Sequence, residues 1–260
     1  MPDEILKKIY IVQFRTDASE PQEQDCYNEE LKACGYDLFY VNAAKGELPE
    51  FIPEDVAGVI MGGSGQFYLS TEEVKNNEWI RNTLRFIDSI LEKNIPLMGV
   101  CYGGHLLSFH QGADLSTDEK FQEVGTFQVE LLPDSEKDPI FSRLKSTFLA
   151  QFGHKTTPIN LPSHLLQLAK TKKVSCQAFR LKNKPAWGLM FHPELNQERM
   201  RARLKLFPNY VPKGTTMEEL LEDFKDTPEA AKVLHLFVDY VSEQQLQKEK
   251  IKQKKAIQIS

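Results

Sequence analysis

One stretch decides the fold: Ile95-Pro96-Leu97-Met98-Gly99-Val100-Cys101-Tyr102-Gly103-Gly104-His105-Leu106-Leu107. An apolar, strand-like run ends at Cys101, which stands between Gly99 and Gly103, and a helix-like pattern follows. A sharp strand-to-helix turn strains its central residue and needs small neighbours on both sides, as in a nucleophile elbow. The thiol would stand at a helix N-terminus, where the helix dipole favours a reactive thiolate. We therefore predict that Cys101 is a nucleophile; the alternative is a buried cysteine that acts as a small apolar residue.

A base for this nucleophile is predicted in Ala186-Trp187-Gly188-Leu189-Met190-Phe191-His192-Pro193-Glu194. An apolar strand ends near His192, and Glu194 follows two residues later. A nucleophilic thiol gains from an imidazole within hydrogen-bond reach, and the imidazole gains from a carboxylate that fixes its tautomer. Cys101, His192 and Glu194 are thus the predicted catalytic residues, because active sites of α/β folds gather at strand ends.

A glycine-rich loop supplies the third feature, since the buried-strand pattern Val56–Met61 runs directly into Gly62-Gly63-Ser64-Gly65. Backbone N–H groups of such a loop can bind an oxyanion, and one such donor is worth roughly 3 to 4 kcal/mol in acyl transfer. We predict that Gly63 and the backbone N–H of Tyr102 are the donors. A phosphate-binding loop is disfavoured, because neither Lys-Ser nor Lys-Thr follows Gly65 and no full G-x-G-x-x-G is present.

The rest of the chain indicates an α/β fold with alternating strands and helices. Strands are predicted at 8–13, 36–41, 56–61 and 95–100, and one helix over 72–93, where Ile80, Leu84, Ile87 and Leu91 recur at helical spacing. This order predicts a mostly parallel central sheet with helices on both faces. From 124 to 191 the strands shorten and alternate, as in Phe127-Val129-Leu131, which predicts an antiparallel extension of the sheet.

Residues 1–200 are predicted to form the principal domain, and residues 201–260 a helical extension packed on it. Thr215-Thr216-Met217-Glu218 has capping-box spacing, and Thr227-Pro228 is typical of a helix start. The second of these two helices carries Val233, Leu234, Phe237 and Val241 on one face, which we expect to dock on the core. The lysine-rich end, 248–255, predicts a solvated, frayed tail.

Charge and cysteine content exclude several classes of function. The formal net charge of −5 argues against a nucleic-acid or anionic-membrane partner. The cysteines at 26, 34, 101 and 176 lack metal-binding or redox-pair spacing, so we expect no metal and no cofactor. Residues 1–4 lack the start of a secretion signal, and no run has the roughly 20 apolar residues of a membrane span. These features favour a cytoplasmic protein, where a thiolate stays reduced.

Together, the Gly-Gly loop, the Gly-Val-Cys-Tyr-Gly elbow and Phe-His-Pro-Glu resemble class I glutamine amidotransferases. The likeness spans about residues 7–200 and is strongest to members similar to the amidotransferase domain of GMP synthase, which share the patterns at 153–154 and 175–180. The resemblance implies a flavodoxin-like fold and a Cys101 that forms a γ-glutamyl thioester. It also implies that His192 moves the proton and that Glu194 orients His192. It also implies that the substrate is a small molecule, glutamine or a γ-glutamyl compound.

The resemblance further places Gly62, Gly103, His105 and His154 at the substrate. The family usually carries a glutamine where His105 stands, and Gly-Asp where Lys155-Thr156 follow His154. The catalytic trio is kept while these substrate-side positions differ. Two activities stay open: an amidotransferase that works with a synthetase subunit, and a self-contained γ-glutamyl peptidase, which the change at His105 favours.

Two further alternatives differ in class. A non-catalytic binding module with this fold would be expected to lose Cys101, His192 or Glu194, and the sequence retains all three. A cysteine variant of the α/β-hydrolases would place its acid before the histidine, which would make Asp134 or Asp138 the acid in place of Glu194.

Overall fold

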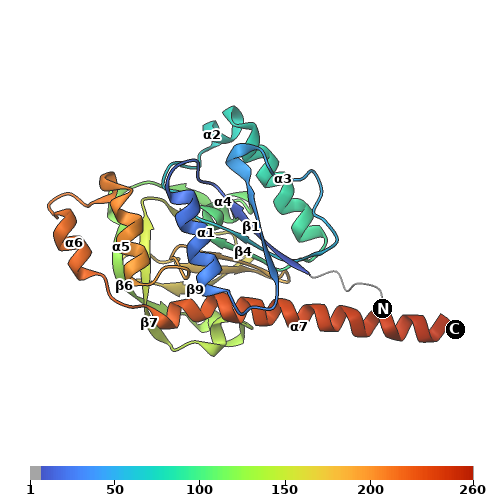
Figure 1. Ribbon diagram of the computed structural model, residues 1–260. Helices are drawn as coiled ribbons and strands as arrows, with labels where there is room; N and C mark the ends of the chain where they lie inside the picture. Colours follow the sequence, from blue (N-terminus) through green and yellow to red (C-terminus); the bar gives the residue numbers. More distant parts are fainter. Residues whose placement is uncertain (1–6, 260) are drawn as a thin grey trace.

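The computed structural model of this chain describes residues 7–259, with the side chains of 252 and 255–259 excepted. The expectation about residues 1–4 therefore lies outside the described residues. A central sheet runs through the molecule, with helices packed on both of its faces (Figure 1). Its nine strands lie in the order β2-β1-β3-β4-β11-β10-β9-β6-β7.

Five neighbouring strands of this sheet are parallel, and the other four are antiparallel. The parallel strands are β1 (Lys8–Gln13), β2 (Asp37–Asn42), β3 (Val56–Met61), β4 (Leu97–Val100) and β11 (Ala186–Leu189). The antiparallel extension consists of β6 (Glu123–Leu131), β7 (Thr147–His154), β9 (Leu165–Lys170) and β10 (Ala178–Leu181). The predicted α/β class, with its parallel centre and antiparallel extension, is confirmed.

A second, small sheet pairs β5 (Asp114–Ser116) with β8 (Thr157–Ile159). The α-helices are α1 (Ser19–Glu30), α2 (Thr71–Asn76), α3 (Glu78–Glu92), α4 (Tyr102–His110), α5 (Gln197–Lys205), α6 (Met217–Asp223) and α7 (Pro228–Ile259). Short 3-10 turns occur at Ala43–Lys45, Glu119–Phe121, Pro133–Lys137, Phe141–Arg143 and Pro208–Tyr210.

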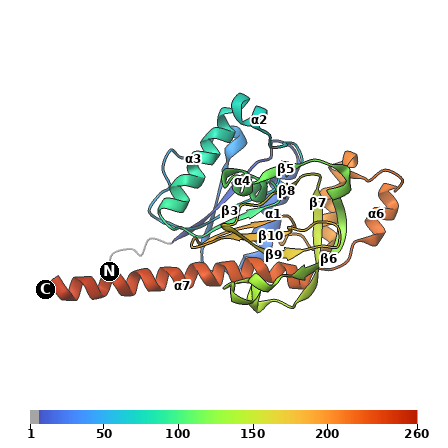
Figure 2. The same ribbon diagram turned by 180° about the vertical axis from the view of Figure 1, so that it is seen from behind.

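The two faces of the sheet bury alternate residues of each strand, because successive side chains of a strand point to opposite faces. On β1, Ile9 and Ile11 lie in the cluster that includes side chains of α1 and α7, whereas Tyr10 and Val12 lie in the cluster formed with α3 and α4. Figure 2 shows α7 crossing one side of the sheet and α3 lying on the other. Both faces are therefore covered, which explains why β3 and β4 are buried along their whole length.

The segment predicted as one helix over 72–93 is two helices, and this correction has a local cause. Asn77 has an extended backbone (φ −114°, ψ 112°), and its side chain donates hydrogen bonds to the carbonyl oxygen and a carboxylate oxygen of Glu73. An asparagine that bonds nearby backbone competes with the helix, so α2 ends at Asn76 and α3 begins at Glu78. The apolar spacing of the longer helix, which produced the prediction, belongs to α3.

The C-terminal helices follow the prediction with two corrections. The capping box is formed one residue later than predicted, between Thr216 and Glu219, and it begins α6. The segment 248–255 continues α7 as regular helix rather than a frayed tail. Lysine, glutamine and glutamate have good intrinsic helix propensity, so the helix persists where α7 extends beyond the sheet (Figure 1).

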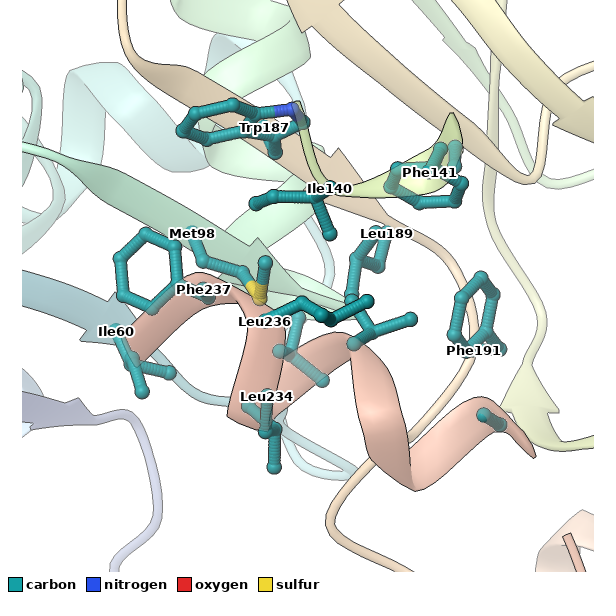
Figure 3. Close-up of a cluster of buried hydrophobic side chains, with 14 of the residues drawn as sticks. Ile60, Met98, Ile140, Phe141, Trp187, Leu189, Phe191, Leu234, Leu236 and Phe237 are labelled. Atoms are coloured by element: carbon teal, nitrogen blue, oxygen red, sulfur yellow. The ribbon is translucent and has the colours of Figure 1, made fainter. Parts of the chain in front are cut away.

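The first half of α7 carries the buried face that was expected. Val233, Leu234, Phe237 and Val241 are all fully buried. Figure 3 shows Leu234, Leu236 and Phe237 beside residues of β3, β4 and β11, among them Ile60, Met98 and Leu189. This helix is thus part of the core. In the part of the chain that the structure describes, no helix combines the length and the apolar character needed to cross a bilayer.

Truncating the buried face of α7 tests its role in the core. Phe237→Ala should lower the free energy of unfolding by about 3–5 kcal/mol, because it removes a fully buried aromatic ring and leaves a cavity. The matched control is Leu246→Ala on the same helix, whose side chain is 55% exposed; it should change stability by less than about 0.5 kcal/mol. Urea unfolding measures both, and equal losses in the two variants would contradict this role of α7.

Candidate active site

Three adjacent parallel strands bring the predicted site together at their carboxyl ends. β3 leads into Gly62-Gly63, β4 leads into Cys101, and β11 ends three residues before His192. The Cys101 N–H donates to the Leu189 carbonyl oxygen of β11 (2.7 Å), and the Gly103 N–H donates to that of Gly62 (3.0 Å). The three loops therefore meet although the segments lie far apart in the sequence.

The backbone at Cys101 has the strained conformation of an elbow, with φ 51° and ψ −105°. A β-carbon on Gly99 would lie 2.5 Å from the Gly103 carbonyl carbon, and one on Gly103 would lie 2.3 Å from the Met61 carbonyl oxygen. Both distances are below any normal contact, so the turn can form only with glycine at these two positions. Strain of this kind costs about 1–3 kcal/mol and is typical of functional sites.

His192 and Glu194 form a buried hydrogen-bonded pair. The His192 Nδ1–H donates to Glu194 Oε1 over 2.8 Å, and the two side chains are 6% and 0% exposed. Burial alone would lower the pKa of His192, but the negative charge of Glu194, together with the charge and hydrogen bond of Cys101, raises it to about 9. The arrangement therefore favours the imidazolium form of His192.

The carboxylate of Glu194 stays ionised although it is buried. Burial would raise its pKa, but His192 and, more weakly, Arg203 hold it below the usual value. Arg203 Nη1 lies 3.9 Å from Glu194 Oε1, which is an ion-pair distance rather than a hydrogen bond. Glu194 can therefore accept the hydrogen bond from His192 Nδ1–H and fix the tautomer of the imidazole.

The Gly63 N–H, one of the two predicted oxyanion donors, is engaged by a carboxylate. It donates to Glu23 Oε1 of α1 over 3.1 Å. Gly63 itself lies at the site: a β-carbon there would lie 2.9 Å from His192 Cε1 and 3.5 Å from Cys101 Cβ. Tyr102 is the first residue of α4, where N–H groups have no partner within the helix. No local sequence signal indicated the Glu23 contact.

A pocket opens beside Cys101 and His192, and its other walls come from parts of the chain that the sequence did not mark. Arg15 follows β1, and Arg203 lies on α5. The strand-end position of Arg15 was a usable signal, whereas nothing local distinguished Arg203 from the surface arginines of its helix. The remaining lining residues are Ser64, Gly65, Val124, Gly153, Leu195, Met200, Leu204, Phe207 and Tyr210.

The predicted substrate residues His105 and His154 lie outside the lining of this pocket. His105 is buried, and burial together with His154 lowers its pKa to about 3, so its imidazole is neutral. His154 is fully buried on β7, with Nε2 3.4 Å from Glu123 Oε2. Gly153, the neighbour of His154, takes the pocket position instead, because adjacent strand residues face opposite sides. Gly62 and Gly103 contribute backbone to the elbow.

The two carboxylates that would have indicated an α/β-hydrolase are not at the site. Asp138 accepts hydrogen bonds from Trp187 Nε1 (2.9 Å) and from the backbone N–H groups of Ile140 and Phe141, which fixes a loop. Asp134 is exposed in a 3-10 turn. Glu194 is therefore the acid that the fold places beside His192.

The other three cysteines do not line the pocket. Cys26, Cys34 and Cys176 are free thiols. Burial raises the pKa of Cys26 to about 11 and that of Cys176 to about 12, so both stay protonated at neutral pH. Within residues 7–259, no group of three or more histidine, cysteine or acidic side chains is arranged to hold a metal ion.

Comparison with known proteins gives one family and a consistent fold. The family described as "Glutamine amidotransferase class-I" matches residues 29–207. The chain is 27% identical over 163 residues to one subunit of the GMP synthase (glutamine-hydrolyzing) from Methanothermobacter thermautotrophicus, which covers 63% of this chain and 77% of that relative. It is 29% identical over 130 residues to the GMP synthase of Thermosipho melanesiensis, which covers half of this chain and 24% of that enzyme. The chain thus spans only about a quarter of such full-length GMP synthases.

Solved structures agree on the fold. A glutamine amidotransferase from Thermotoga maritima superimposes with a TM-score of 0.72 at 21% identity, over 90% of this chain and 97% of that one. A protein described as a putative GMP synthase subunit, from Thermoplasma acidophilum, gives 0.65 at 20% identity, over 94% and 98%. At these identities the likeness shows the architecture alone.

The charge balance at His192 is testable by titration. Glu194→Gln should lower the pKa of His192 from about 9 toward 6.5, because burial, which disfavours the imidazolium, is then opposed by Cys101 alone. NMR of the histidine Cε1–H signals, assigned with a His192→Asn variant, measures this. Glu198→Gln, an exposed carboxylate on α5, is the control and should leave the titration unchanged.

The raised pKa of His192 also makes the stability of the protein depend on pH. A folded-state pKa above the ordinary 6.5 means that charged His192 stabilises the fold fully below pH 6.5, and this contribution is lost as the pH rises through about 9. The stability difference between the native protein and Glu194→Gln should therefore shrink across that interval. A difference that stays constant from pH 6 to 10 would argue against the coupling of His192 to Glu194.

Proposed function

The chain belongs to the class I glutamine amidotransferase family, and from this premise we propose that it hydrolyses a γ-glutamyl amide through a thioester on Cys101. The observation that carries the proposal is the meeting of Cys101, at its strained elbow, with the buried His192–Glu194 pair. This is the arrangement that nucleophilic acyl transfer needs: a nucleophile, a proton carrier and a group that orients the carrier.

In the first half-reaction the Cys101 sulfur attacks the γ-carbonyl carbon and forms a C–S bond. The carbonyl oxygen becomes an oxyanion, and its collapse breaks the bond to the leaving nitrogen. The imidazolium of His192 gives its proton to that nitrogen, so that ammonia or an amine leaves. In the second half-reaction His192 takes a proton from water, the hydroxide attacks the thioester, and γ-carboxylate and thiol are released.

The oxyanion is assigned to the backbone N–H groups of Tyr102 and Gly63. The Tyr102 N–H stands at the start of α4, where the helix dipole also favours negative charge. The Gly63 N–H has to exchange Glu23 Oε1 for the substrate oxygen before it can serve. Since one donor contributes about 3 to 4 kcal/mol, this exchange bears directly on the rate.

The nature of the leaving group divides two forms of this function. Relatives named as GMP synthase subunits favour a separate synthetase subunit as the partner, to which this chain would deliver ammonia in the cytoplasm. The second candidate is a self-contained γ-glutamyl peptidase. It is favoured by His105, which replaces the glutamine usual in the family and is buried and neutral outside the pocket lining.

Product analysis with purified protein separates the two forms. Glutamine and a panel of γ-glutamyl dipeptides are incubated with the protein, and glutamate, ammonia and released amino acid are measured. Cleavage of the dipeptides in preference to glutamine would identify a peptidase that needs no partner. Release of ammonia from glutamine would identify an amidotransferase.

Cys101→Ser should abolish turnover of every active substrate, because a serine hydroxyl is a far weaker nucleophile than a thiolate at neutral pH. Cys34→Ser is the matched control, since that thiol is half-buried on the C-terminal side of α1 and away from the pocket. It should retain full activity. Undiminished turnover by Cys101→Ser would contradict the thioester mechanism.

A further inference from the structure

Two buried guanidinium groups line the pocket beside Cys101. The side chains of Arg15 and Arg203 are 2% and 6% exposed, and both residues belong to the pocket wall. Arginine is almost never fully buried unless it is paired, because desolvating its charge is costly. Two such groups at one pocket, next to the predicted nucleophile, point to an anionic ligand.

Arg15 is fixed on one side and faces the site with the other. Its Nε donates to Glu23 Oε1 (2.9 Å) and its Nη1 donates to Ser19 Oγ (3.0 Å). Its Nη2 lies 3.1 Å from the point that a Gly63 β-carbon would occupy, and Cys101 Cβ lies 3.5 Å from the same point. One small molecule can therefore reach both the thiol and this nitrogen.

Arg203 has bonding capacity that the protein leaves unused. Its Nε donates to Gln22 Oε1, which orients the guanidinium plane. Its two terminal nitrogens, Nη1 and Nη2, are buried and have no hydrogen-bond partner within residues 7–259. Glu194 Oε1 is too distant, at 3.9 Å, and already accepts from His192. Buried donors on a charged group are expensive to leave unpaired, so an acceptor from a ligand would be strongly favoured.

The rest of the pocket wall is mainly apolar and excludes water from the two guanidinium groups. The apolar residues are Val124, Leu195, Met200, Leu204 and Phe207. In such surroundings a hydrogen bond between a guanidinium and a carboxylate is stronger than in water, and arginine matches the planar carboxylate with two donors. A neutral amide at the same place would lack the charge.

We propose that Arg15 and Arg203 form an anion subsite that holds the α-carboxylate of the γ-glutamyl group whose γ-carbonyl is attacked by Cys101. The inference rests on the proposed function and names its substrate class. The subsite accepts glutamine or γ-glutamyl compounds with a free α-carboxylate, and it rejects glutamine side chains within proteins, where the α-carboxyl group is an amide. Arg15 and Arg203 are thus specificity-determining residues.

The test compares two reagents that differ only at the α-carboxyl group. The chloroketone analogue of glutamine and its α-carboxamide both alkylate a thiol at the position of the γ-carbonyl. Labelling of Cys101 is followed by intact mass, with iodoacetamide as a measure of thiol reactivity alone. The native protein should react at least about 30-fold faster with the carboxylate reagent than with the carboxamide, as expected for a lost charged hydrogen bond.

Arg203→Met should remove most of this preference. Its rate with the carboxylate reagent should fall about 30-fold, while its rates with the carboxamide and with iodoacetamide stay within about twofold. Arg201→Met is the matched control, because Arg201 lies on the same helix, donates to the Leu221 carbonyl oxygen and does not line the pocket. It should behave as the native protein.

A role of Arg203 limited to supporting Glu194 would give a different result. Arg203→Met would then slow all three reagents together, and this outcome would overturn the subsite. Equal labelling of native Cys101 by the two chloroketones would also overturn it, and that comparison needs no variant. Both results leave the proposed function standing. If neither chloroketone labels Cys101 while iodoacetamide does, the proposed function itself fails.

Discussion

The backbone of the elbow is tied to a strand on each side, and the site depends on those two ties. The Cys101 N–H donates to the carbonyl oxygen of Leu189, the last residue of β11. The Gly103 N–H donates to the carbonyl oxygen of Gly62, which follows β3. These bonds hold the thiol between the glycine loop and the end of β11. They also press α4 so closely against β3 that no side chain fits at Gly103. The positions of His192 and Gly63 relative to the thiol follow from this contact.

Around this frame the protein buries a balanced set of charges. Arg15 and Arg203 are cations, and Glu23 and Glu194 are carboxylates. Although burial lowers the pKa of His192, Glu194 and Cys101 raise it to about 9. The two carboxylates have separate roles, since Glu23 holds Arg15 and the Gly63 N–H, whereas Glu194 holds His192. Because the surroundings are apolar, each of these contacts is stronger than on the surface. Arg203 is the member whose donors are left for a ligand.

Several elements could be predicted from the sequence because their signals are local. The strands at 8–13 and 56–61 have the predicted bounds, and those near 36–41 and 95–100 differ by one or two residues. The helix predicted over 72–93 failed at Asn77, where a side-chain hydrogen bond overrides apolar spacing. The prediction of a frayed tail at 248–255 was also wrong. There the segment is helical although it lacks a buried face, because its residues have good helix propensity.

The sequence by itself determined the parallel centre of the sheet, the strained turn at Cys101 and the placing of His192 and Glu194 at a strand end. Apolar runs and glycine spacing within about ten residues predict each of these features. Only the tertiary structure decided that Glu23 engages the Gly63 N–H, that His105 lies outside the pocket lining and that Arg203 is part of it. Such choices depend on which helix packs over which strand end, and residues distant in the chain decide them together.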